Sequence, residues 1–84
     1  MTMTSRTVSI TSASDIGAIL RLLRKETGHT QREMAGLCNV SLPFLNQVEQ
    51  GKPTAQIGKV LEVCRRHGIE VVFNLPAKPD DEGK

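Results

Sequence analysis

The side chains of this 84-residue chain that could act on another molecule are hydrogen-bonding amides and cations. We expect neither of its two histidines, His29 and His67, to pair with a nucleophile and no two carboxylates to share an apolar setting, and the sequence has no glycine-rich loop that could hold a phosphate. The two cysteines, Cys38 and Cys64, form no Cys-x-x-Cys pair and fall at apolar helical positions, where free cysteine behaves as a small hydrophobic residue. We therefore expect recognition rather than catalysis, with no cofactor and no metal site.

The composition limits what such side chains could bind. Eleven Lys and Arg residues against nine Asp and Glu give a net charge of +2, which suits a modest number of phosphate contacts. Two Phe residues, with no Trp or Tyr, leave few groups to stack on unpaired bases, so single-stranded RNA is a disfavoured ligand. No signal peptide and no stretch of roughly 20 apolar residues occurs, so we expect a cytoplasmic protein that does not enter the membrane.

Two short helices joined by a tight turn are predicted between Gly28 and Gly51. Thr30 is a good N-cap residue, and Glu33 stands three residues later, which completes the capping-box pattern. Asn39 tolerates the left-handed backbone conformation well, so it can end the first helix at the position where such turns most often carry glycine. The residues of this first helix expected to face inward are Met34, Ala35 and Cys38.

The second helix is predicted to follow Ser41, another good N-cap residue. Pro43 fits its first turn, where the missing N–H group would have no helical partner in any case. Leu45 and Val48 point back to the core, and Val40 fills the corner between the helices. This spacing predicts a helix-turn-helix, in which the second helix is the one that enters the DNA major groove. Its outward positions are Leu42, Pro43, Asn46, Gln47 and Gln50.

Two further helices complete the predicted domain, residues 12–68. The first is capped by Ser12 and ends before Gly28, and the last is capped by Thr54 and ends at Gly68. The first helix buries a stripe of Ile16, Leu20 and Leu23, with Ile19 on the flank, and carries Arg21, Arg24 and Lys25 outside. The inward residues of the last helix are Ile57, Val60, Leu61 and Cys64.

A short β-strand is predicted at residues 69–76, because the run is β-branched and aromatic and is stopped by Pro76. A lone strand leaves its backbone N–H and C=O groups unpaired. It could pair with Val8–Ile10 of the N-terminal arm, residues 1–11, or with its counterpart in a second copy. A two-fold dimer would also enlarge the small core of a single domain. The predicted dimer interface is Ile69, Val71, Val72, Phe73 and Leu75, and residues 77–84 are predicted to be a disordered tail.

With these elements placed, the sequence from about Ile16 to Ile69 resembles the Cro/CI-type helix-turn-helix family, also called the XRE family. The residues that carry the resemblance are Thr30-Gln31, Met34-Ala35, Asn39-Val40-Ser41, Leu45 and Val48-Glu49-x-Gly51-Lys52-Pro53. The loop at Gly51–Thr54 and the strand after the fourth helix resemble HipB-type antitoxins. The resemblance implies an all-α, lambda-repressor-like bundle of four to five helices, with the short C-terminal strand pairing in a dimer.

The family resemblance also implies a function. It implies a homodimer that binds double-stranded DNA at a palindromic operator near its own promoter and represses transcription. The antitoxin resemblance further implies a complex with a HipA-type toxin kinase. Two alternatives remain open: a phage-type repressor without a toxin partner, and a helical module that binds only protein. The apolar Leu42 and Pro43, where many relatives carry polar or basic residues, favour the last alternative.

The predicted DNA contacts follow from the motif. In the family, the equivalent of Gln31 anchors a phosphate at a helix N-terminus. Amide side chains such as Asn46 and Gln47 can pair with adenine in the major groove, or can remain a solvated polar face. Glu49 is expected to serve a structural role toward Arg24. The predicted DNA-binding set is Thr30, Gln31, Arg32, Ser41, Leu42, Pro43, Asn46, Gln47 and Lys52.

Overall fold

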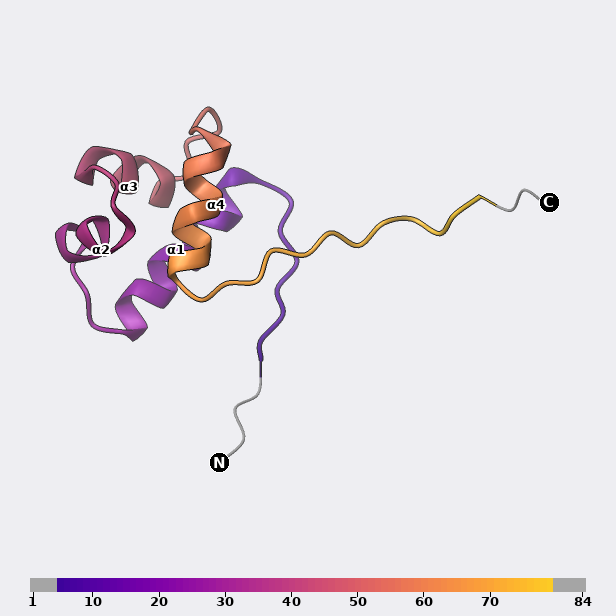
Figure 1. The fold of residues 1–84 in the computed structure, drawn as a ribbon, viewed down its shortest axis with the longest axis horizontal. Helices are drawn as coiled ribbons and strands as arrows, with labels where there is room; N and C mark the ends of the chain where they lie inside the picture. Colours follow the sequence, from indigo (N-terminus) through magenta and orange to yellow (C-terminus); the bar gives the residue numbers. More distant parts are fainter. Residues whose placement is uncertain (1–4, 80–84) are drawn as a thin grey trace.

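Four helices make up the regular structure of residues 5–79, the part of the chain that this computed structural model describes (Figure 1). The helices are α1 (Ala13–Glu26), α2 (Gln31–Cys38), α3 (Leu42–Glu49) and α4 (Ile57–Arg66). The prediction of an all-α helix-turn-helix bundle is confirmed. Among the described helices, none combines the length and the apolar character that crossing a membrane requires.

The predicted caps set the boundaries of the first three helices. The side chains of Ser12 and Ser41 accept hydrogen bonds from backbone N–H groups three residues on, at 3.2 and 3.1 Å. Thr30 and Glu33 form the full capping box, in which each side chain accepts from the other residue's backbone N–H. Asn39 adopts φ 58° and ψ 43°, the left-handed conformation that turns the chain between α2 and α3.

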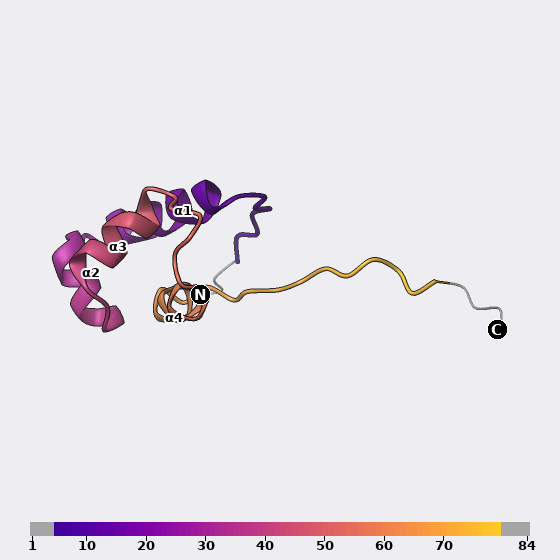
Figure 2. The same cartoon turned by 90° about the horizontal axis from the view of Figure 1, so that it is seen from above.

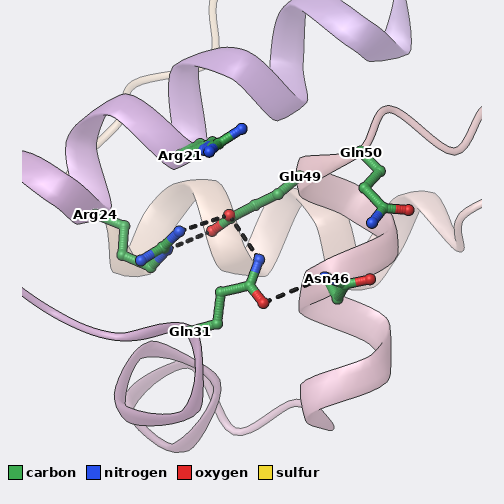
Figure 3. A pocket seen from close by; sticks show the side chains of 6 residues that line it. All are labelled: Arg21, Arg24, Gln31, Asn46, Glu49 and Gln50. Carbon is green, nitrogen blue, oxygen red and sulfur yellow. Dashed lines mark hydrogen bonds and ion pairs between the residues drawn. The ribbon is translucent and has the colours of Figure 1, made fainter.

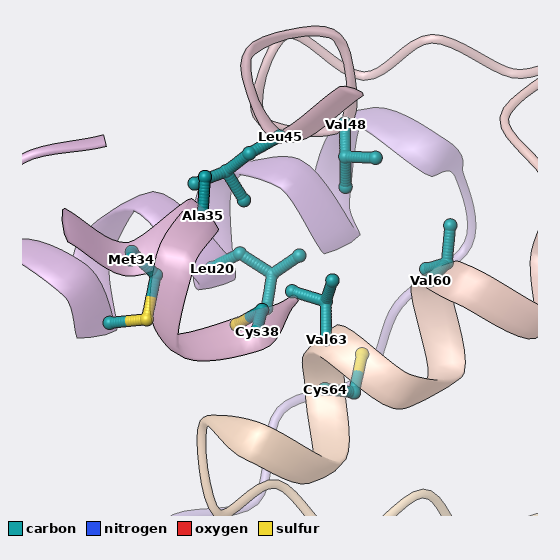
Figure 4. Close-up of a cluster of buried hydrophobic side chains, with 9 residues drawn as sticks. All are labelled: Leu20, Met34, Ala35, Cys38, Leu45, Val48, Val60, Val63 and Cys64. Carbon is teal, nitrogen blue, oxygen red and sulfur yellow. The ribbon is translucent and has the colours of Figure 1, made fainter. Parts of the chain in front are cut away.

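The core lies where α4 covers the α1, α2 and α3 layer (Figure 4). Leu20 of α1, Leu45 of α3 and Val63 of α4 are completely buried, so three helices meet at one point. Both cysteines lie in this core as free thiols. The buried apolar residues are Leu20, Met34, Ala35, Cys38, Leu45, Val48, Val60, Val63 and Cys64.

The predicted start of α4 was wrong, and so was part of the face of α4 that was predicted to be buried. The helix begins at Ile57, its N-cap residue is Gln56, and no side chain caps it, so Thr54 does not serve as the cap. Ile57 and Leu61 are 64% and 44% exposed, whereas Val63 is fully buried. Val60, Leu61, Val63 and Cys64 are all apolar, so the sequence fits either of two adjacent helical faces. Packing against α2 selects the face that contains Val63.

The predicted strand at residues 69–76 does not form in the single chain. Among residues 5–79 no segment is a strand, and after Ile69, which packs on the core, the chain runs out from the bundle as an extended tail (Figure 2). A strand needs a neighbour, and the N-terminal arm does not supply one. The arm is instead held to α1 by an Arg6–Glu26 ion pair and by a bond from the Thr11 N–H to Asp15. Residues 80–84 of the predicted disordered tail lie outside the described residues.

Helices α1 and α3 are in close contact at Gly17. A Cβ atom at this position would stand 2.4 Å from the Val48 carbonyl oxygen and 2.6 Å from that of Glu49. Backbone atoms cannot rotate away as a flexible side chain can. The absence of a side chain at Gly17 therefore sets the spacing between α1 and α3.

We expect Gly17→Ala to lower the free energy of unfolding by about 2 kcal/mol, because the new methyl group would push α3 away from α1. The matched control is Gly36→Ala, an exposed helical position in α2 with nothing within 4 Å of the added Cβ. There the gain in helix propensity should raise the free energy of unfolding by about 0.5–1 kcal/mol. Urea denaturation measures both, and equal effects would contradict the close contact.

Candidate nucleic-acid interface

An open polar recess lies between α1, α2 and α3, on the exposed side of the helix-turn-helix (Figure 3). Its volume is about 330 Å³. Polar and charged side chains line it throughout, in contrast to the apolar lining that is typical of small-molecule pockets. The lining residues are Arg21, Arg24, Gln31, Asn46, Glu49 and Gln50.

A buried ion pair forms the floor of the recess. Arg24 Nε donates to Glu49 Oε2 at 2.8 Å, and a second guanidinium nitrogen donates to Oε1 at 3.0 Å. The two side chains are only 10% and 2% exposed. Arg24 also donates to the His29 carbonyl oxygen, which ties the turn between α1 and α2 to the pair. The structural role expected for Glu49 is confirmed, and the placement of Arg24 on the outer face of α1 was wrong.

Two amide side chains extend this pair to the surface. Gln31 Nε2 donates to Glu49 Oε1 at 2.9 Å, and Asn46 Nδ2 donates to Gln31 Oε1 at 3.2 Å (Figure 3). Gln31 is the first residue of α2 and Asn46 lies in α3, so the chain of bonds crosses three helices. We call Arg24, Glu49, Gln31 and Asn46 the polar relay. Each link restrains the next side chain, so the half-buried amides have a set orientation.

The charge of Glu49 is maintained by this network. Burial, the largest single cause, raises the pKa of its carboxyl group, but the hydrogen bonds from Arg24 and Gln31 together with the charges of Arg24 and Arg21 outweigh burial. The net result is a pKa below the usual value of 4.5. A pKa that is lower in the folded state stabilises the fold above the unfolded-state pKa, and this contribution is lost as the pH falls through the folded-state value.

We expect Glu49→Gln to lower the free energy of unfolding by about 3 kcal/mol at neutral pH, because Arg24 would stay buried without an opposite charge. The variant should also lose less stability than the wild type as the pH falls below about 4.5, since it lacks the titrating carboxyl. Urea denaturation at several pH values checks both effects. Glu26→Gln, which removes the exposed partner of Arg6, should change little. Equal effects of the two variants would contradict the role of burial.

The other residues predicted to bind DNA are not part of the polar relay and do not line the recess. Lys52 Nζ donates to Gln47 Oε1 at 3.2 Å, which brings the loop after α3 to the exposed side of that helix. Arg32 and Pro43 are exposed and Leu42 is half-buried. The two remaining members of the set, Thr30 and Ser41, use their hydroxyl oxygens as helix caps.

The recess also includes two residues, Arg21 and Gln50, for which the sequence predicts neither a DNA contact nor a structural role. Gln50 had been assigned only to the outward face of α3, and Arg21 to the outer face of α1. The sequence did contain a signal that Arg21 lies at this site. Arg21 stands one helical turn before Arg24, which the family resemblance already links to Glu49. The exposed position expected for Arg21 on the first helix obscured this signal.

Residues 15–72 match the family described as "Helix-turn-helix domain". The chain is also 45% identical over 69 residues to the uncharacterized HTH-type transcriptional regulator y4mF of Sinorhizobium fredii (strain NBRC 101917 / NGR234), covering 82% of this chain and 91% of the relative. The chain therefore belongs to the helix-turn-helix family of transcriptional regulators, as the sequence predicts.

Solved structures agree with this assignment at the level of the fold. A HipB–O4 20mer complex matches with a TM-score of 0.73 and 17% identity, and a HipA–HipB–O2–O3 complex matches with a TM-score of 0.73 and 15% identity. In both comparisons the match covers 86% of this chain and 100% of the other chain. The fold is thus similar to that of HipB.

Proposed function

We propose that this protein is a DNA-binding transcriptional repressor that reads a duplex through α3. The observation that carries the proposal is the polar relay, which orients the amides of Gln31 and Asn46 on the exposed side of a helix-turn-helix. An amide needs two free hydrogen-bonding groups to pair with an adenine edge. Asn46 uses one N–H for Gln31, so its Oδ1 and its second N–H stay available for a base.

Phosphate contacts would set the position of α3 in the groove. The N-terminus of α2 presents backbone N–H groups and Arg32, and Lys52 lies beside Gln47 near the C-terminus of α3. Leu42 and Pro43, at the start of α3, offer only apolar contact, for example with a thymine methyl group. Direct reading of bases therefore depends on Asn46 and Gln47, and DNA shape supplies further selectivity.

We expect Asn46→Ala to lose about 1–3 kcal/mol of binding free energy on duplexes that carry one preferred base pair, and much less when that base pair is changed. Lys52→Ala should weaken binding to all duplexes alike and lower the log–log salt slope by about 0.9. Fluorescence anisotropy against DNA from upstream of the gene, over a range of salt concentrations, measures both.

This experiment also tests the alternative of a module that binds only protein. If the wild-type protein binds no upstream duplex even at low salt, the proposed function is wrong. If Asn46→Ala weakens every sequence equally, Asn46 is not a base-reading residue.

We further propose that two copies form a homodimer that binds a palindromic operator. The support is the apolar run after α4, where Val71, Val72, Phe73 and Leu75 are 48–81% exposed. A second copy of the chain carries the same apolar run, so in a two-fold dimer each copy would cover the exposed side chains of the other. The dimer would set two α3 helices about one DNA turn apart, so palindromy follows from its symmetry.

We expect Val71→Asp to lower the sedimentation mass from that of two chains to that of one, because a charge would be buried in the dimer interface. The control is Asn74→Asp, which adds the same charge to the same segment at a position that is already polar. A dimer that persists in Val71→Asp would place the interface elsewhere.

An association with a HipA-type toxin kinase is the remaining part of the proposal. It is supported by the similarity of the fold to HipB, which has been solved together with HipA. Co-expression with the product of the adjacent reading frame should give a complex on size-exclusion chromatography if that frame encodes a kinase-like protein. A neighbouring frame of another kind, or no complex, would leave a repressor without a toxin partner.

A further inference from the structure

We propose that Arg21, on α1, binds a phosphate of the DNA backbone and extends the DNA-binding surface beyond the helix-turn-helix. This inference rests on the proposed function, because it assigns one more contact to the same surface. It adds a residue of α1, whereas all the contacts described above lie between Thr30 and Lys52.

The position of Arg21 follows from the contact between α1 and α3. Gly17 brings α1 against the C-terminal turn of α3, and Arg21 stands about one turn further along α1 on the same side. Its side chain is exposed and lines the same recess as Gln31 and Asn46. In Figure 3, Arg21 and Gln31 lie on opposite sides of the Glu49 carboxylate.

The Arg21 guanidinium forms no ion pair among the described residues, and its charge acts on Glu49 only at longer range. Within residues 5–79, the ion pairs join Arg6 to Glu26, Arg24 to Glu49, and Arg65 and Arg66 to Glu62, and the Arg21 side chain forms no hydrogen bond. Glu49, the carboxylate of the same recess, already accepts two bonds from Arg24 and one from Gln31. Arg21 therefore offers a guanidinium with its donors free.

A free guanidinium beside oriented amides suits a phosphate better than a base. Arg21 comes from the helix next to α3 and not from α3 itself, so it would lie outside the groove that α3 enters. Phosphates border that groove, and a guanidinium can donate two parallel hydrogen bonds to one phosphate. The Arg21 contact would carry no sequence information and would fix the angle of α3 in the groove.

The test compares Arg21→Ala with Lys25→Ala, which removes the same charge from the same helix at an exposed position outside the recess. Binding to duplex DNA from upstream of the gene, and to a scrambled duplex, is measured by fluorescence anisotropy over a range of KCl concentrations. Arg21→Ala should weaken both duplexes by a similar factor, about tenfold at low salt, and reduce the log–log salt slope by about 0.9. Lys25→Ala should leave the slope unchanged.

Three results would overturn the inference. Equal effects of the two variants would mean that only the overall charge matters, and an unchanged slope in Arg21→Ala would mean that no phosphate is lost. A large fall in the urea midpoint of Arg21→Ala, with the salt slope preserved, would make Arg21 a structural partner of Glu49. Wild-type protein that binds neither duplex would instead contradict the proposed function itself, and the Arg21 contact with it.

Discussion

The buried pair of Arg24 and Glu49 is the interaction on which the rest of the surface depends. Charges that leave water cost several kcal/mol each unless they are paired and hydrogen-bonded. Here the two Glu49 oxygens accept three hydrogen bonds, and the third guanidinium nitrogen of Arg24 donates to the His29 carbonyl oxygen in the turn after α1. The pair joins α1 to α3 and, through Gln31, to the start of α2. Folding requires that the buried charges be paired and hydrogen-bonded. The hydrogen bonds that meet this requirement also orient the amide side chains at the surface.

Local signals in the sequence predict the helix-turn-helix well. Thr30 with Glu33, Asn39 and Ser41 act through hydrogen bonds and backbone angles within a few residues, so their effect does not depend on the rest of the fold. The family resemblance adds the link between Glu49 and Arg24, which spans 25 residues and has no local signal of its own.

The remaining features depend on packing between distant segments, which a single sequence does not specify. The face of α4 is decided by contact with α2, and the apolar sequence fits two neighbouring faces about equally, so Ile57 and Leu61 were expected in the core. A strand at residues 69–76 has suitable composition but no partner in the chain. In the site, the position of Arg21 depends on the spacing between α1 and α3. That spacing follows from the close contact of Gly17 with the backbone of α3, which the sequence alone does not reveal.

The order of links in the polar relay has a consequence for how such a protein diverges. Asn46 is the last link: it donates one bond to Gln31, is half-buried, and supports no residue beyond itself. Its replacement therefore removes a surface contact while the Arg24–Glu49 pair keeps its bonds. Changes at Glu49 or Arg24, in contrast, affect the fold first. Under the proposed function, selection for a new DNA sequence can thus act on Asn46 at small cost in stability, and proteins with different targets can share one unchanged core.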